Sequence, residues 1–178
     1  KVLEVPLSYL VSPQQARLGE VAFRKKATSV KDRHRVEAEV LQAVERYLQI
    51  EEILGLVSEH WEQPFPPVRI ERIEQASDVA ASVRSEWALG TAPIRDLTEL
   101  LEEKGIKVLF LSLPDSVSGL TCVVQRENQV DVPVIVVNRS DGLERRRHTL
   151  AHELGHRLIL CAEAMEEKAV AYFSGSFL

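Results

Sequence analysis

The chain has 178 residues, of which 45% are hydrophobic, and it carries a formal net charge of −5 at pH 7. This length suits one domain, or one domain with an extension, and the apolar content is enough for a real core. The acidic balance argues against a strongly basic nucleic-acid-binding protein, although it leaves room for a local basic patch. The two cysteines, Cys122 and Cys161, give no disulfide framework and favour a reducing cytoplasm. No apolar run reaches the roughly 18 residues that span a membrane, and no signal peptide is evident.

The first residues are amphipathic and then basic. Lys1 to Ser12 resembles the last helix of a helix-turn-helix domain of the Xre repressor type, which would make the chain the C-terminal part of a fusion protein. An ordinary amphipathic start to the domain is the alternative. Residues 23–35 are basic, which suits a solvated linker and helix start more often than a contact with DNA phosphates.

A long helix is predicted next. It begins at Ser29 or Asp32, has apolar residues at three- and four-residue steps as far as Leu54, and ends at Gly55. Its apolar stripe needs a partner. That partner is either the rest of the chain or a second copy, in a homodimer through residues 31–54.

Residues 62–67 contain three prolines and break any helix, so they predict a linker or an extended arm. Beyond them a second helix is predicted from Ser77 to Leu89, with Gly90 as its stop. A third helix is predicted with Pro93 in its first turn and Gly105 at its end.

The hydrophobic pattern changes after this point. Three short β-branched or apolar runs follow, separated by turn residues. The runs are Ile106–Leu111, Leu120–Gln125 and Val134–Asn138. They predict a small three-stranded antiparallel sheet in a mostly helical α+β fold. An edge strand of such a sheet can pair with an extended peptide.

The stretch His152-Glu153-Leu154-Gly155-His156 is an H-E-x-x-H motif. On a helix, residues four apart share one face, so His152 and His156 can present two nitrogens to one ion at about 2.0–2.1 Å. The carboxylate of Glu153 lies beside that ion and suits the removal of a proton from metal-bound water. This is the chemistry of a zinc peptidase. A solvated pair of histidines, or one satisfied within the core, is the alternative.

The surrounding residues favour a buried zincin-like helix. Asp141 and Glu144 have capping-box spacing, and Ser140 and Gly142 also suit a helix start. An apolar stripe follows the same helix at Leu143, Leu150, Leu154 and Leu158. A polar His-Glu-His set inside such a helix needs partners, and a metal ion provides them.

A catalytic zinc commonly has three protein ligands and one water, so a third ligand is expected after this helix. Three carboxylates compete for the place: Glu163, Glu166 and Glu167. If the helix simply continued, Glu163 would lie about 10 Å along its axis. The chain must therefore turn back near residues 161–164, so that a second helix crosses the first. An acidic helix start that only suits the helix dipole is the alternative.

Three motifs occur in a fixed order: a strand ending in Val137-Asn138, the Arg145-Arg146-Arg147 step, and Thr149–His156. Together they resemble the ImmA/IrrE family of bacterial zinc metallopeptidases. The resemblance covers about residues 75–178, and it implies a metallopeptidase domain at residues 71–178. Residues 1–12 and 13–70 would then be the tail of the helix-turn-helix domain and a helical linker or extension.

The resemblance also implies roles for individual residues. The family carries its third ligand in a Glu-x-x-Ala-x-x-Phe pattern, and Glu167, Val170 and Phe173 hold that spacing with Val in place of Ala. Glu167 is therefore the predicted ligand, and Glu166 is the second choice. The strand Gly119–Gln125 is the predicted substrate-side edge of the sheet.

His148 shares the ligand face but stands where Phe is frequent in the family. It lies about 6 Å too far along the helix for easy ligation, which favours a core or outer-sphere residue over a third nitrogen ligand or a substrate contact. Arg145 to Arg147 and Arg157 are expected to form a solvated, salt-bridged face rather than to bind acidic substrate groups.

The leading hypothesis is a cytoplasmic zinc-dependent endopeptidase, with manganese as another possible metal. Its expected substrate is a specific repressor protein, cut once in a stress or mobile-element response. The second hypothesis is a DNA-binding transcriptional regulator or antitoxin-like protein, whose peptidase-like domain senses or binds without turnover. DNA would then bind through an upstream domain, and no membrane partner is expected.

Overall fold

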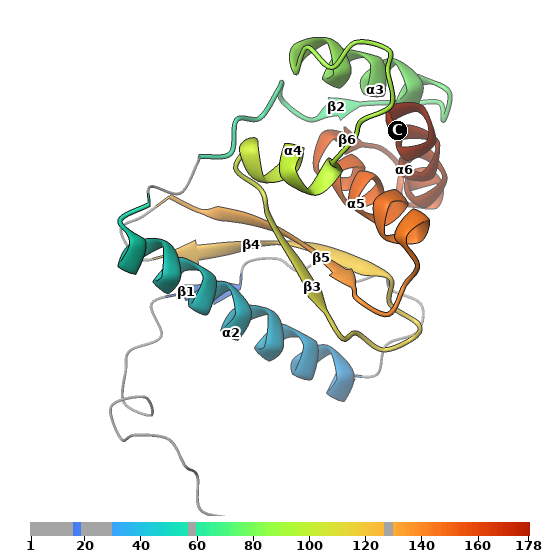
Figure 1. Cartoon of the computed structure of the whole chain (residues 1–178). Coiled ribbons are helices and arrows are strands. Elements are labelled where there is room, and N and C mark those ends of the chain that lie inside the picture. Colours follow the sequence, from blue (N-terminus) through green and yellow to red (C-terminus); the bar gives the residue numbers. More distant parts are fainter. Residues whose placement is uncertain (1–15, 19–29, 57–59, 127–129) are drawn as a thin grey trace, which may run out of the picture.

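The structure is a computed structural model that describes residues 16–18, 30–56, 60–126 and 130–178. In this part of the chain a four-stranded sheet has the order β1–β4–β5–β3, and a second sheet pairs β2 with β6 (Figure 1). The strands are β1 (Ala16–Leu18), β2 (Val68–Arg69), β3 (Lys107–Leu111), β4 (Gly119–Arg126), β5 (Val132–Asn138) and β6 (Ile159–Leu160). The helices are α2 (Val30–Leu54), α3 (Gln75–Glu86), α4 (Leu97–Glu103), α5 (Leu143–Leu158) and α6 (Glu163–Phe177). The fold is therefore of the α+β class, as the sequence predicts.

The main sheet is mixed. β4 runs antiparallel to β5 and to β1, whereas β3 runs parallel to β5. The three strand segments agree with the predicted runs to within two residues. The prediction of a three-stranded antiparallel sheet is nevertheless wrong, because β1 adds a fourth strand and β3 pairs with β5 in parallel.

Asn138 explains how the chain passes from β3 to β4 across the end of β5. Its buried side-chain amide donates hydrogen bonds to the carbonyl oxygens of Leu113 at 3.2 Å and Val117 at 3.0 Å. Its backbone N–H donates to the carbonyl oxygen of Ser118. These bonds hold the β3–β4 connection at the end of β5. The strand β5 therefore lies between β3 and β4 in the sheet. The hydrophobic pattern of a strand indicates which of its faces is buried, but it does not indicate which strand pairs with it. The sequence pattern could therefore not predict the strand order of the sheet.

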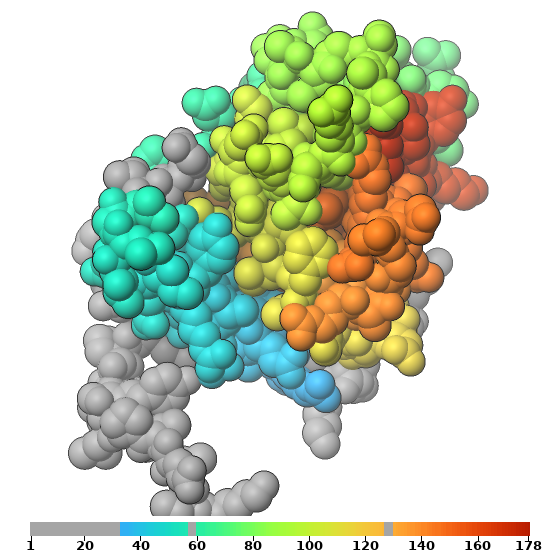
Figure 2. All heavy atoms as spheres, in the orientation of Figure 1, coloured from blue at the N-terminus to red at the C-terminus, as the bar shows by residue number. Residues whose placement is uncertain are grey.

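Alternate residues of the sheet enter two separate cores. On the α5 face, three sheet residues pack with α3, α4, α5 and α6: Val108, Ile135 and Val137. On the α2 face, six sheet residues pack with α2: Leu120, Cys122, Val124, Val132, Val134 and Val136. The space-filling view shows the yellow atoms around β3 between α2 and α5 (Figure 2).

The helix α2 confirms the prediction of a long helix ending before Gly55. Its stripe of Val36, Val40 and Val44 is fully buried against the sheet. Near its C-terminal end, the Lys107 ammonium group of β3 contacts the Glu51 carboxylate at 2.5 Å. The sheet is thus the partner that the stripe requires, and a homodimer through residues 31–54 remains a prediction.

Two predicted helix starts are shifted. α3 begins at Gln75 rather than Ser77, and the Gln75 side-chain oxygen accepts hydrogen bonds from two preceding backbone N–H groups. The third helix was predicted with Pro93 in its first turn, but α4 begins at Leu97. Asp96 is the residue that caps it, because its carboxylate accepts a hydrogen bond from the Glu99 N–H.

The predicted helix-turn-helix remnant, residues 1–12, lies outside the described residues, as does most of the basic run. His34 and Arg35 belong to the described part of that run and lie exposed on α2, where they contact Glu37 at 3.3 Å and Glu39 at 2.9 Å. This arrangement fits the solvated helix start. None of the described helices is both long and apolar enough to cross a membrane.

Candidate metal centre

The H-E-x-x-H motif lies on the most deeply buried stretch of α5. The Nε2 atoms of His152 and His156 are 3.2 Å apart, and the two side chains are 2% and 11% exposed. One helical turn brings the two imidazoles to the same point, as their spacing predicts.

The beginning of α5 agrees with the prediction at Gly142 but differs from it in the capping box and at Leu143. Gly142 is the N-cap, no side chain caps the helix, and Leu143 is 74% exposed. The predicted capping box and the first member of the apolar stripe are therefore wrong. The rest of the stripe, Leu150, Leu154 and Leu158, is buried as expected.

The chain turns back after α5, and α6 crosses it closely. A Cβ added at Gly155 would lie 2.9 Å from a Val170 methyl carbon and 3.0 Å from the Phe173 ring, so only glycine allows this approach. The crossing brings Glu167 to the histidines. Its carboxylate oxygens lie 3.6 Å from His152 Nε2 and 3.7 Å from His156 Nε2.

These three side chains fit a zinc ion. Each offers one ligand atom, and the three atoms lie within 4.8 Å of one another. Two ligands at about 2.0–2.1 Å from a tetrahedral ion lie roughly 3.3 Å apart, close to the 3.2 Å between the two imidazole nitrogens. Nitrogen lone pairs that face each other at this distance need a proton or a cation between them. The Glu167 side chain is 57% exposed, so the group opens to solvent on the α6 side.

The other two candidate carboxylates do not join this group. Glu166 contacts the opposite nitrogen of His156, with Nδ1 and Oε1 3.1 Å apart. Glu163 is the first residue of α6 and is exposed. Among the described residues the structure thus assembles the trio of the sequence prediction, His152, His156 and Glu167.

Glu153 follows His152 on α5 and is buried near the start of β4, where it is 2% exposed. A Cβ added at Gly119 would lie 2.4 Å from Thr149 Cγ2, 2.7 Å from the Val136 carbonyl oxygen and 3.6 Å from Glu153 Cγ. The absence of a side chain at Gly119 therefore lets the strand backbone approach the Thr149 and Glu153 side chains of α5.

Arg157 is a neighbour of this site for which the sequence predicts a solvated, salt-bridged face. Its guanidinium group donates a hydrogen bond to Thr121 Oγ1 of β4 at 3.2 Å. Burial lowers the pKa of Arg157, whereas the nearby Cys122 thiol and Glu153 carboxylate raise it. The expected solvated face is therefore wrong for this residue. Its place one helical turn after Glu153 was the signal available in the sequence.

His148 and the other arginines lie outside the metal group. His148 is exposed, its Nε2 is 3.0 Å from Ser174 Oγ, and its ring centroid is 6.1 Å from that of His152. It is therefore not a core residue. Arg145 donates to Ser118 Oγ at 2.7 Å, while Arg147 donates to the carbonyl oxygen of Ile94 at 2.5 Å.

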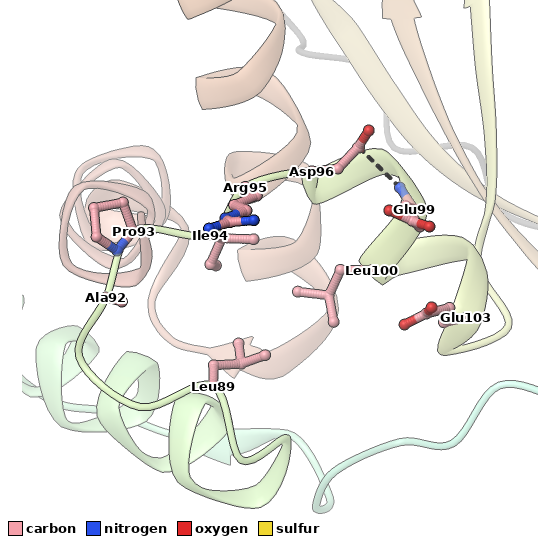
Figure 3. A pocket seen from close by; sticks show the side chains of 9 residues that line it. All are labelled: Leu89, Ala92, Pro93, Ile94, Arg95, Asp96, Glu99, Leu100 and Glu103. Atoms are coloured by element: carbon pink, nitrogen blue, oxygen red, sulfur yellow. Dashed lines mark hydrogen bonds between the residues drawn. The ribbon is translucent and has the colours of Figure 1, made fainter.

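A separate hollow of about 300 Å³ lies between the α3–α4 connection and α4 (Figure 3). Arg84 and Arg147 fix this connection by donating to its backbone carbonyl oxygens. The floor of the hollow includes Leu89 and Leu100, while Glu99 and Glu103 lie at its side. None of the three metal-group residues lines it, so the hollow is distinct from the metal centre.

A comparison with models of known protein families gives a match to the part of the chain that contains this site. Residues 101–173 match a peptidase family model described as the IrrE N-terminal-like domain. Over these residues the chain is similar to the ImmA/IrrE family. The ImmA/IrrE segment begins in α4, includes β3, β4, β5 and α5, and ends in α6, so it contains every residue of the metal group. The chain therefore carries a metallopeptidase-like domain. No curated protein and no solved structure gives a significant match.

Proposed function

We propose that the protein is a zinc-dependent endopeptidase with His152, His156 and Glu167 as metal ligands and Glu153 as general base. The observation that carries this proposal is the group of three ligand atoms, together with a buried carboxylate at the residue that follows the first histidine. The ImmA/IrrE match over the same residues supports it. Zinc is preferred over manganese because two imidazoles and a carboxylate are a donor set of catalytic zinc sites.

The residues of the chain have separate tasks in this reaction. When bound, zinc would supply a coordinated water with a pKa near 7 and would polarise the scissile carbonyl. Glu153 accepts the proton of the attacking water and delivers it to the leaving amine. Its side chain is buried near the start of β4, which limits its movement.

The start of β4 suits an extended substrate. β1 pairs with residues 124–126 of this strand, whereas Gly119 lies beside Glu153. A substrate backbone that pairs with the Gly119 end would bring its scissile bond to the base. This supports β4 as the substrate-side strand.

The proposed substrate is a specific repressor protein in the cytoplasm, cut once in a stress or mobile-element response. Similarity to the ImmA/IrrE family supports this class of substrate. Under the alternative function, a regulator that binds without turnover, the same site would hold its metal and cleave nothing.

The decisive experiment measures metal content and cleavage together. Wild-type protein is loaded with zinc and incubated with repressors encoded beside its gene, and Glu153→Gln is treated in parallel. We expect about one zinc per chain in both proteins, with a single cut only in the wild type. Zinc-loaded wild type that cleaves none of these repressors but binds specific DNA as the full-length protein would favour the alternative.

A further inference from the structure

Glu166 is the charged neighbour of the metal group that the proposed reaction does not use. Its Oε1 atom lies 3.1 Å from His156 Nδ1, and the two side chains are 44% and 11% exposed. The next residue, Glu167, approaches Nε2 of the same ring. The two carboxylates of α6 thus contact opposite nitrogens of one imidazole.

The helix explains this division. Successive residues of an α-helix are rotated by about 100°, so neighbouring side chains leave it in different directions. Glu166 lies in the first turn of α6, where the helix dipole favours negative charge, and Glu167 follows it. Glu166 and Glu167 can therefore act on the same histidine without competing for the same place.

The contact decides which nitrogen of His156 carries a proton. A neutral imidazole has one donor nitrogen and one acceptor nitrogen, and a carboxylate only accepts. Hydrogen bonding to Glu166 therefore favours the proton on Nδ1 and leaves the Nε2 lone pair facing His152 and Glu167. That is the form of the ring that can bind a metal through Nε2.

We propose that Glu166 is a positioning residue that fixes the tautomer and ring orientation of His156. This inference rests on the metal site of the proposed function, and it assigns Glu166 to the outer sphere rather than to the metal. Removing such an outer-sphere partner typically weakens metal binding by about 10- to 100-fold. Because the Glu166 side chain is 44% exposed, we expect the lower end of this range.

The test compares Glu166→Ala and Glu166→Gln with the wild type, without any peptidase assay. Zinc affinity is measured by chelator competition. Ring tautomers are read from ¹H–¹⁵N correlation spectra of metal-free protein at pH 8.5, where histidine is ordinarily neutral. Glu86→Ala is the control, since it removes an exposed carboxylate at the end of α3. Thermal unfolding verifies that each variant is folded.

We expect the Nδ1-protonated form of His156 in the wild type and its loss in Glu166→Ala, with zinc bound roughly 10-fold more weakly. Glu166→Gln keeps an acceptor oxygen and should restore most of the tautomer, and Glu86→Ala should behave as the wild type. An unchanged His156 tautomer in Glu166→Ala would overturn the proposal. So would a complete loss of zinc equal to that of Glu167→Ala, which would make Glu166 a ligand. A lack of peptidase activity affects neither readout and counts only against the proposed function.

Discussion

The two faces of the sheet are built on different principles. The α2 face is almost entirely aliphatic, because three valines of α2 pack on six apolar residues of β4 and β5. The α5 face also has an apolar core, but His152, Glu153 and Thr149 are buried within it. The buried polar residues of the α5 face lie within the ImmA/IrrE segment, whereas α2 and α3 precede that segment.

This difference shows where the molecule places its chemistry. Burial of a polar side chain costs free energy unless a partner compensates for it. On the α2 face the principal charged contact is the ion pair between Lys107 and Glu51, and both of these side chains are largely buried. On the α5 face the buried histidines meet an exposed carboxylate of α6, so the polar group opens toward solvent and possible ligands. Variants on the two faces should therefore affect different properties.

The largest expected effect is on the α5 face. Glu153→Gln removes the proton acceptor but keeps the size of the side chain, so cleavage should fall by about 10²- to 10⁴-fold while zinc stays bound. His152→Ala and His156→Ala should lose both zinc and activity, and Glu167→Gln should weaken zinc binding because an amide is a poorer ligand. Metal analysis beside a repressor cleavage assay measures these effects. A wild-type cleavage rate in Glu153→Gln would contradict the mechanism.

The second effect is on the α2 face and concerns stability. Glu51→Ala leaves the Lys107 ammonium group, whose side chain is 6% exposed, without its carboxylate. The free energy of unfolding should fall by about 3 kcal/mol, as expected when one partner of a buried ion pair is removed. The double variant Lys107→Met/Glu51→Leu replaces both charges with apolar groups and should recover most of this loss. Urea denaturation measures both. Equal destabilisation by the single and the double variant would show that charge burial is not the cause.

A third effect tests the close approach of β4 to α5. Gly119→Ala places a methyl group against a Val136 carbonyl oxygen and the Thr149 side chain, which should cost about 1–3 kcal/mol and displace the strand beside Glu153. Stability and cleavage should fall together, as followed by urea denaturation and the repressor assay.

Gly175→Ala in α6 is the matched control, because in the described part of the chain no atom beyond its neighbours and the helix's own backbone lies within 4 Å of the added carbon. It should stabilise the helix by up to about 1 kcal/mol. Wild-type cleavage by a folded Gly119→Ala variant would show that the strand can move without disturbing the base.

The smallest effect distinguishes the two cysteines. Burial raises the pKa of Cys122, on the α2 face, to about 12, so almost no thiolate exists there at pH 8. Burial and the nearby Glu166 also raise the pKa of Cys161, but this residue is half-buried. Iodoacetamide at pH 8 should therefore modify Cys161 slowly and leave Cys122 intact, with both labelled in urea, as read by mass spectrometry. Faster labelling of Cys122 than of Cys161 in folded protein would show that the α2 face opens.

The sequence determined the features that depend on local geometry. The four-residue spacing of His152 and His156 fixed the meeting of two imidazoles, because a helix repeats every 3.6 residues. Apolar periodicity located α2, and short β-branched runs located β3, β4 and β5. The choice of Glu167 over Glu166 came from the resemblance to ImmA/IrrE proteins, and the structure places Glu167 in the metal group.

The tertiary structure decided everything that depends on which elements become neighbours. The parallel pairing of β3 with β5 follows from the loop that Asn138 holds across the strand end, over sequence separations that no local pattern encodes. The hydrogen bond from Arg157 to Thr121 and the contact of Glu166 with His156 Nδ1 exist only because β4 and α6 both pack on α5. Hydrophobic periodicity can predict that one face of a helix or strand is buried. It cannot predict which element covers that face, because the covering element packs through residues far apart in the chain.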